Sequence, residues 1–208
     1  MRLSGWILPL ALSLAPALAA SSFAHAAPTG PELVKALRQG GYVLVMRHAN
    51  APATPPDHAS ADPDNAHAER QLDEAGRAQA HAVGAALHRM GIPIGRVLVS
   101  PAYRARETAR LAGLPPLQPV EQLSEGPAGM MAMADKMRMG YLRKAAAERP
   151  LAGTNTIIIT HTPNILAAFG REAKGIAPAE VMVMQPDGHG GSTLVTRLTA
   201  QDWMALHR

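Results

Sequence analysis

Short runs of apolar residues predict the strands of this protein. Residues 42–46 (YVLVM) form a continuous apolar run and residues 156–160 (TIIIT) a β-branched one, which is typical of strands buried on both faces. Further strands are expected at residues 96–99, 118–120, 180–185 and 192–198. The last two flank a Pro-Asp-Gly-His-Gly-Gly segment, which predicts a hairpin.

Apolar residues at helical spacing predict helices between these strands. Residues 73–90 carry Ala, Val and Leu at that spacing and are followed by Gly91, a typical helix stop. One further helix is expected with Ser100 as its cap and another with Thr162 as its cap, each with proline at the first helical position. The remaining expected helices are residues 31–39 and 130–148.

Strands that alternate with helices predict a layered α/β domain with a largely parallel sheet. Residues 49–70 and 123–129 show no periodicity and are expected as loops, and loops as long as the first are often functional. The 208 residues, of which 47% are hydrophobic, suffice for one such domain. Cysteine is absent, which excludes disulfides, thiolate metal clusters and a cysteine nucleophile.

The net charge of +4 comes from Lys and Arg spread along the chain, and only 3% of residues are aromatic. A nucleic-acid partner is therefore not expected, whereas a small anionic ligand suits the charge. A metal site is not expected either, because the histidines that could be considered as ligands have spacings that match no ligand pattern. These are His58, His67, His81, His88 and His189.

The amino terminus resembles a secretory signal. Residues 6–20 are an apolar stretch shorter than a bilayer span, and Ala24-His25-Ala26 supplies the small-x-small pattern that a signal peptidase reads. We therefore expect residues 1–26 to be a signal peptide and residues 27–208 to be a single exported domain, periplasmic or secreted, without stable membrane association after cleavage. The alternative is an uncleaved membrane anchor, which would also place the domain outside the cytoplasm.

Three of the predicted strands end in candidate site residues. Arg47 and His48 follow the first strand, Arg104 lies about one turn into the helix that follows the second, and His161 follows the β-branched strand. Ligands of open parallel sheets bind beyond the carboxyl ends of the strands, where helix amino termini also point. Two guanidiniums, two imidazoles and two helix starts predict an anion site that suits phosphate.

Four segments resemble motifs of the histidine phosphatase superfamily, also called phosphoglycerate mutase-like. They are VLVMRHA at 43–49, LDEAGRAQ at 72–79, SPAYRARETA at 100–109 and ITHT at 159–162. The resemblance covers almost the whole chain after the signal and implies a three-layer α/β/α sandwich with a mostly parallel central sheet. It also implies that His48 is the nucleophile, that Arg47, Arg104 and protonated His161 bind the phosphoryl oxygens, and that no metal or other cofactor is needed.

The family also supplies a carboxylate that protonates the leaving group. Glu125 is the preferred candidate here, because Leu-x-Glu resembles the pattern of the mutase branch, and Glu121 is the alternative. The chain departs from the family in Ala49-Asn50, where many members carry Gly and a small polar residue. The R-H-G-x-R-x-P pattern of acid phosphatases and phytases is absent, which argues against a phytase.

These residues favour an exported, metal-independent phosphatase that hydrolyses phosphomonoesters through a phosphohistidine on His48, with a small phosphorylated substrate. The alternatives are a phosphoglycerate mutase-type phosphotransferase and an inert phosphate-binding or phosphosugar-binding module with the same fold. If neither carboxylate reached the site, substrates with good leaving groups such as phosphohistidine would be favoured. The sequence leaves the physiological substrate and the oligomeric state open.

Overall fold

The computed structural model describes residues 30–52, 69–125 and 132–206, and within them one six-stranded sheet with the order β3-β2-β4-β1-β5-β6. The strands are β1 (Val43–Arg47), β2 (Ile94–Val99), β3 (Leu117–Pro119), β4 (Asn155–Thr160), β5 (Val181–Pro186) and β6 (Ser192–Leu198). β3, β2, β4 and β1 run parallel, whereas β5 pairs antiparallel with β1 and β6 with β5. The predicted mostly parallel sheet and terminal hairpin are therefore confirmed.

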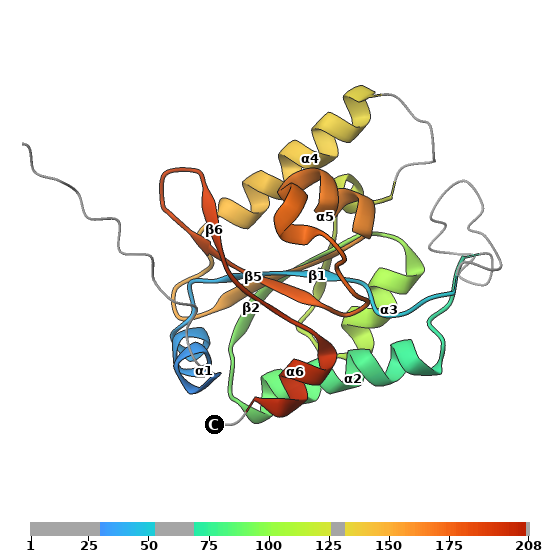
Figure 1. The fold of residues 1–208 in the computed structure, drawn as a ribbon. Helices are drawn as coiled ribbons and strands as arrows, with labels where there is room; N and C mark the ends of the chain where they lie inside the picture. The colour runs from blue at the N-terminus through green and yellow to red at the C-terminus, as the bar shows by residue number, and fades with distance from the viewer. Residues whose placement is uncertain (1–29, 53–68, 126–131, 207–208) are drawn as a thin grey trace, which may run out of the picture.

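Helices cover both faces of the sheet (Figure 1). They are α1 (Gly30–Gln39), α2 (Glu74–Arg89), α3 (Tyr103–Leu111), α4 (Ala132–Ala147), α5 (Thr162–Phe169) and α6 (Ala200–Ala205). Alternate side chains of β1 enter two apolar cores: Leu44 and Met46 pack with α1, α2, α3 and α6, while Val43 and Val45 pack with α4 and α5. The chain thus forms the expected three-layer α/β/α sandwich.

Two helix starts differ from the sequence prediction. The prediction of Ser100 as a cap is wrong: α3 begins at Tyr103 with Ala102 as N-cap, because the Ser100 hydroxyl accepts the Ala102 N–H within a turn before the helix (3.3 Å). The cap of α5 is His161, one residue before the predicted Thr162. The His161 backbone is still extended, and its carbonyl accepts the first helical bond, from the Ile165 N–H (3.1 Å).

The last helix, α6, was not predicted, because it is too short to show a helical period in the sequence. A capping box between Thr199 and Asp202 starts this helix, and its Trp203 is fully buried in the core beside α2. Most other elements differ from the prediction by shifts of one or two residues at their ends, the largest at the start of β2. The predicted start of the α4 helix at residue 130 lies outside the described residues.

The expected signal peptide at 1–26 and most of the expected loop at 49–70 lie outside the described residues. In the part of the chain that the structure describes, no helix has the length and apolar character needed to span a membrane.

Candidate active site

Three side chains predicted for the site are buried together at the carboxyl edge of the sheet. His48 follows β1, Arg104 lies in the first turn of α3, and His161 follows β4, with exposed fractions of 5%, 3% and 0%. The rings of His48 and His161 meet edge to face with centroids 5.2 Å apart. Parallel pairing of β1 and β4 sets this arrangement, since Arg47 lies opposite Thr160 in the register.

The His48 ring is held as a neutral base with one free nitrogen lone pair. Its Nδ1 lies 2.7 Å from the Ala49 carbonyl oxygen, which can only accept, so Nδ1 carries the proton and Nε2 the lone pair. Burial, with contributions from Arg104 and Arg47, lowers the pKa of His48 to about 3. At neutral pH, Nε2 is therefore unprotonated and nucleophilic.

The backbone around His48 is fixed from three sides. The His48 N–H donates to the Thr160 carbonyl of β4 (3.0 Å), and the His48 carbonyl accepts from the Ala179 N–H (3.2 Å). The Ala49 N–H donates to Thr108 Oγ1 (3.0 Å), whose own hydroxyl donates to the Arg104 carbonyl (2.7 Å). Thr108 thereby links the nucleophile segment to the helix that carries Arg104.

The LDEAGRAQ segment secures the next residue, Asn50. Gln79 Oε1 accepts the Asn50 N–H (3.0 Å). The Asn50 side chain donates to the Asp73 carboxylate (2.7 Å), which also caps the amino terminus of α2. A Cβ at Gly76 would lie only 2.0 Å from the Asn50 carbonyl oxygen, so only glycine allows this close approach of α2. This motif positions the nucleophile segment and supplies no reacting group.

Arg47 lies half-buried at the end of β1 and donates from Nη1 to the Ile176 carbonyl (2.8 Å). Its buried Nε has no hydrogen-bond partner among the described residues and remains a donor available to an anion. Burial and the nearby Arg70 lower the pKa of Arg47, but a guanidinium stays charged at neutral pH.

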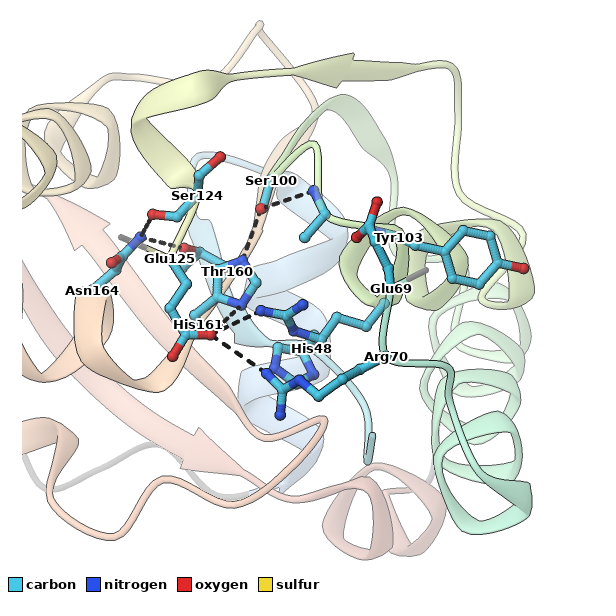
Figure 2. Close-up of polar contacts among 12 residues, drawn as sticks. His48, Glu69, Arg70, Ser100, Tyr103, Ser124, Glu125, Thr160, His161 and Asn164 are labelled. Atoms are coloured by element: carbon cyan, nitrogen blue, oxygen red, sulfur yellow. Dashed lines mark hydrogen bonds and ion pairs between the residues drawn. The ribbon is translucent and has the colours of Figure 1, made fainter. Parts of the chain in front are cut away.

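Glu125 is the predicted acid that reaches the site (Figure 2). Its Oε2 lies 2.8 Å from Arg104 Nη2, 3.5 Å from Arg70 Nη2 and 3.6 Å from His161 Nδ1. The side chain is one-third exposed, so it lies at the mouth of the buried cluster. The alternative, Glu121, is exposed in the 3₁₀ turn η2 (Glu121–Leu123).

The surroundings of His161 favour the neutral ring. The expected protonation of His161 on binding a phosphoryl group stays a prediction. Complete burial lowers the pKa of His161 well below its ordinary value, and the positive charge of Arg104 lowers it further. Its Nε2 lies 2.8 Å from Ser100 Oγ, and its buried Nδ1 has no hydrogen-bond partner among the described residues. Nδ1 instead faces the carboxylate of Glu125.

Three residues that were not predicted from the sequence help to build the site. Arg70 reaches Glu125, and the preceding Glu69 is buried and accepts the Tyr103 N–H at the start of α3 (2.5 Å; Figure 2). Asn164 of α5 donates to the Leu123 carbonyl (3.0 Å) and so holds the turn that carries Glu125. The only sequence signal for Arg70 is its place just before the LDEAGRAQ motif.

Among the described residues, no group of three or more His, Cys, Asp or Glu side chains could hold a metal ion. His81 and His88 both lie along an apolar groove between α2 and the end of α3, away from the strand ends, and His189 lies in the β5–β6 turn. His58 and His67 lie outside the described residues. The chemistry of the described cluster is that of two imidazoles, three guanidiniums and one carboxylate.

The model of the histidine phosphatase superfamily (branch 1) matches residues 43–157, which is more than half of the chain. This protein therefore belongs to the histidine phosphatase superfamily. The matched segment includes the His48 and Arg104 motifs, whereas His161 lies four residues beyond its end.

Solved structures show the same fold at low sequence identity. The protein histidine phosphatase SixA, complexed with tungstate, has a TM-score of 0.54 and 22% identity, and the alignment covers 77% of this chain and 98% of SixA. A mutant phosphoserine phosphatase from Entamoeba histolytica, in complex with phosphoserine, has a TM-score of 0.55 and 13% identity, over 77% of this chain and 98% of that one. No curated protein matches the sequence.

Proposed function

We propose that this protein is a phosphatase that hydrolyses phosphomonoesters through a phosphohistidine on His48. The observation that carries the proposal is the fixed tautomer of His48, whose Nε2 lone pair lies in a buried cluster with Arg104 and His161. A neutral imidazole can attack phosphorus, and the surrounding donors can stabilise the charge that the transferring phosphoryl group spreads over its oxygens.

In the first step, Nε2 of His48 attacks phosphorus in line with the ester oxygen. The substrate binds as its monoanion, and its proton passes to the Glu125 carboxylate. The bond from nitrogen to phosphorus then forms as the bond from phosphorus to the ester oxygen breaks, and the leaving alkoxide takes that proton from Glu125. Arg47, Arg104 and His161 bind the three equatorial oxygens during the transfer. The products are the free alcohol and phosphorylated His48.

In the second step, water attacks the phosphohistidine. Glu125, now a carboxylate, accepts a proton from the water as its oxygen bonds to phosphorus, and the bond to Nε2 breaks. Inorganic phosphate leaves as its monoanion with the proton that Glu125 took up, so that Glu125 is again a carboxylate and His48 is again neutral. The same carboxyl group thus serves as acid and then as base, which suits its position at the edge of the buried cluster.

The presence of a carboxylate in the site favours substrates with poor leaving groups. An alkoxide needs a proton as it departs, whereas the nitrogen leaving group of a phosphohistidine or an aryl oxide needs it less. Glu125 therefore supports small alkyl phosphomonoesters as the substrate class. SixA, a protein histidine phosphatase, shares the fold but at an identity too low to transfer its substrate.

We also propose that the protein acts outside the cytoplasm, with residues 1–26 removed as a signal peptide. The apolar stretch at 6–20 and the Ala-His-Ala pattern at 24–26 support this. N-terminal sequencing of the protein from a periplasmic extract tests it. A terminus near residue 27 is expected, and an intact terminus in the membrane fraction would contradict cleavage.

The test of the enzymatic proposal is phosphate release in the presence of EDTA, with p-nitrophenyl phosphate and a panel of phosphosugars as substrates. Wild-type protein is expected to release phosphate, and His48→Ala is expected to release none above background. Transfer of the phosphoryl group within or between sugars, without free phosphate, would indicate a mutase. Phosphate binding without turnover in both proteins would indicate a binding module.

A further inference from the structure

We propose that Ser100 is a positioning residue that sets the tautomer of His161, so that this neutral ring presents an N–H to the transferring phosphoryl group. The two side chains come from neighbouring strand ends, β2 and β4, and both are fully buried. Ser100 Oγ lies 2.8 Å from His161 Nε2 (Figure 2). The inference rests on the function proposed above.

The direction of this hydrogen bond follows from the partners of the Ser100 hydroxyl. Its oxygen accepts the N–H of Ala102 (3.3 Å), so a lone pair is already used. Among the described residues, His161 Nε2 is the one hydrogen-bond acceptor within reach of the hydroxyl proton. A buried hydroxyl that cannot donate is costly, so the hydroxyl donates and Nε2 accepts.

The other ring nitrogen gives an independent argument for the same tautomer. His161 Nδ1 lies 3.6 Å from Glu125 Oε2 and has no hydrogen-bond partner among the described residues. A lone pair on Nδ1 would face a carboxylate, which is repulsive, whereas a proton on Nδ1 is attracted to it. Both nitrogens therefore favour a ring protonated on Nδ1.

Ser100 is held firmly enough to select a tautomer. Its N–H donates to the Ile159 carbonyl of β4 (3.0 Å), and the bond from Ala102 closes the turn that leads into α3. The hydroxyl therefore has a fixed place beside the ring. It acts through His161 and does not touch the reacting atoms.

This arrangement lets His161 donate to a phosphoryl oxygen without first taking up a proton. The rings of His48 and His161 are in contact, so a phosphoryl group on Nε2 of His48 would lie within reach of the second ring. A ring protonated on Nε2 would instead turn a lone pair toward the anion. Loss of the Ser100 hydroxyl should therefore weaken transition-state stabilisation even though both histidines remain.

The experiment is long-range ¹H–¹⁵N NMR of the histidine rings at neutral pH, with His161→Gln used to assign the His161 signals. In the wild-type protein the Nδ1-protonated tautomer is expected. In Ser100→Ala, where Glu125 alone still favours the Nδ1 proton, part of the ring should shift to the Nε2-protonated form, and in Ser100→Ala/Glu125→Gln that part should be larger. Ser124→Ala is the matched control, because the Ser124 hydroxyl is buried nearby without a hydrogen-bond partner among the described residues and its loss should leave the His161 signals unchanged.

Kinetics give the second readout. Ser100→Ala should lower kcat/KM for an alkyl phosphomonoester roughly 10- to 100-fold, mainly through kcat, and Ser124→Ala should change it little. A wild-type His161 protonated on Nε2, or a Ser100→Ala protein with unchanged ring signals and rate, would overturn the inference. Because the NMR result needs no turnover, an inactive wild-type protein with the expected tautomer would contradict the proposed function alone.

Discussion

The two halves of the site are built differently. The phosphoryl half, with His48, Arg104 and His161, is at most 5% exposed and lies on strand ends and a helix start that neighbouring elements fix by hydrogen bonds. The leaving-group half consists of Glu125 and Arg70, whose side chains are 33% and 18% exposed and which both come from connecting segments. The first half is preformed, and the second lies at the surface where different alcohols can enter.

The carboxylate of Glu125 contacts the same donors that would bind a phosphoryl oxygen. Its Oε2 lies near Arg104, Arg70 and His161 at once, as an anionic oxygen of a substrate would. Under the proposed function, substrate binding would therefore displace this carboxylate from the arginines toward the leaving group. Because the halves differ in this way, we expect substitutions in the buried half to lower the turnover of every substrate. Substitutions of Glu125 or Arg70 should lower turnover to an extent that depends on the leaving group of the substrate.

Removal of Arg104 should have the largest of these effects. Arg104→Ala removes a buried charge aimed at the phosphoryl oxygens and should lower kcat/KM by about 10²- to 10⁴-fold for every substrate, including those with good leaving groups. Steady-state phosphate release measures this. Arg110→Ala is the matched control, since Arg110 lies on the same helix, exposed and paired with Glu107, and should behave as wild type. A loss confined to poor leaving groups would contradict the assignment.

Removal of the Glu125 charge should have a substrate-dependent effect. Glu125→Gln should lower kcat by about 10²- to 10⁴-fold for alkyl phosphates but much less for p-nitrophenyl phosphate, whose leaving group needs no proton. Inorganic phosphate should at the same time bind more tightly in calorimetry, because the resident anion is gone. Glu121→Gln should change neither property. Equal losses on both substrates would show that Glu125 is not the acid.

Gly76 tests whether the nucleophile segment depends on its packing against α2. The Cβ of Gly76→Ala would clash with the Asn50 carbonyl, so urea unfolding should show a free energy of unfolding lower by about 1–3 kcal/mol, together with reduced kcat. Gly140→Ala is the control, because Gly140 lies in α4 with open space around its Cβ and should gain about 0.5–1 kcal/mol. A stable, fully active Gly76→Ala protein would refute this role for α2.

The buried neutral His48 predicts an effect on stability that appears only at acidic pH. Its pKa falls from 6.5 in the unfolded chain to about 3 in the fold, so between these values the unfolded state binds a proton that the folded state does not. The free energy of unfolding should therefore fall as the pH drops below 6.5, by up to about 1.4 kcal/mol per pH unit from this group. His48→Gln should show a shallower decline in urea titrations from pH 7 to 4. Parallel declines would mean that His48 titrates normally.

The buried half of the site could be predicted from the sequence because its residues follow apolar strands. In a parallel sheet the ends of such strands meet, so Arg47, His48 and His161 had to lie near one another whatever the details of the loops. The protonation state of His161 could not be predicted, because its pKa depends on complete burial and on the distance to Arg104.

The surface half could be predicted only in part. Glu125 was one of two carboxylates in the same short segment, and its choice over Glu121 depends on how Thr160 and Asn164 hold the Leu123 carbonyl. Arg70 belongs to a long aperiodic segment. The sequence does not show that the end of this segment is held at the start of α3 by the hydrogen bond from the Tyr103 N–H to Glu69. Contacts of this kind join residues far apart in the chain and leave no periodic signal.

The central claim is that His48 carries the phosphoryl group, and the most direct measurement is to trap it. Wild-type protein mixed with substrate for milliseconds, quenched in alkali and digested should yield a phosphorylated peptide containing His48, which mass spectrometry identifies, and the phosphoryl group should appear and decay as fast as phosphate is released. Phosphate release at the full rate with no phosphoryl group on His48 at any time would contradict the account.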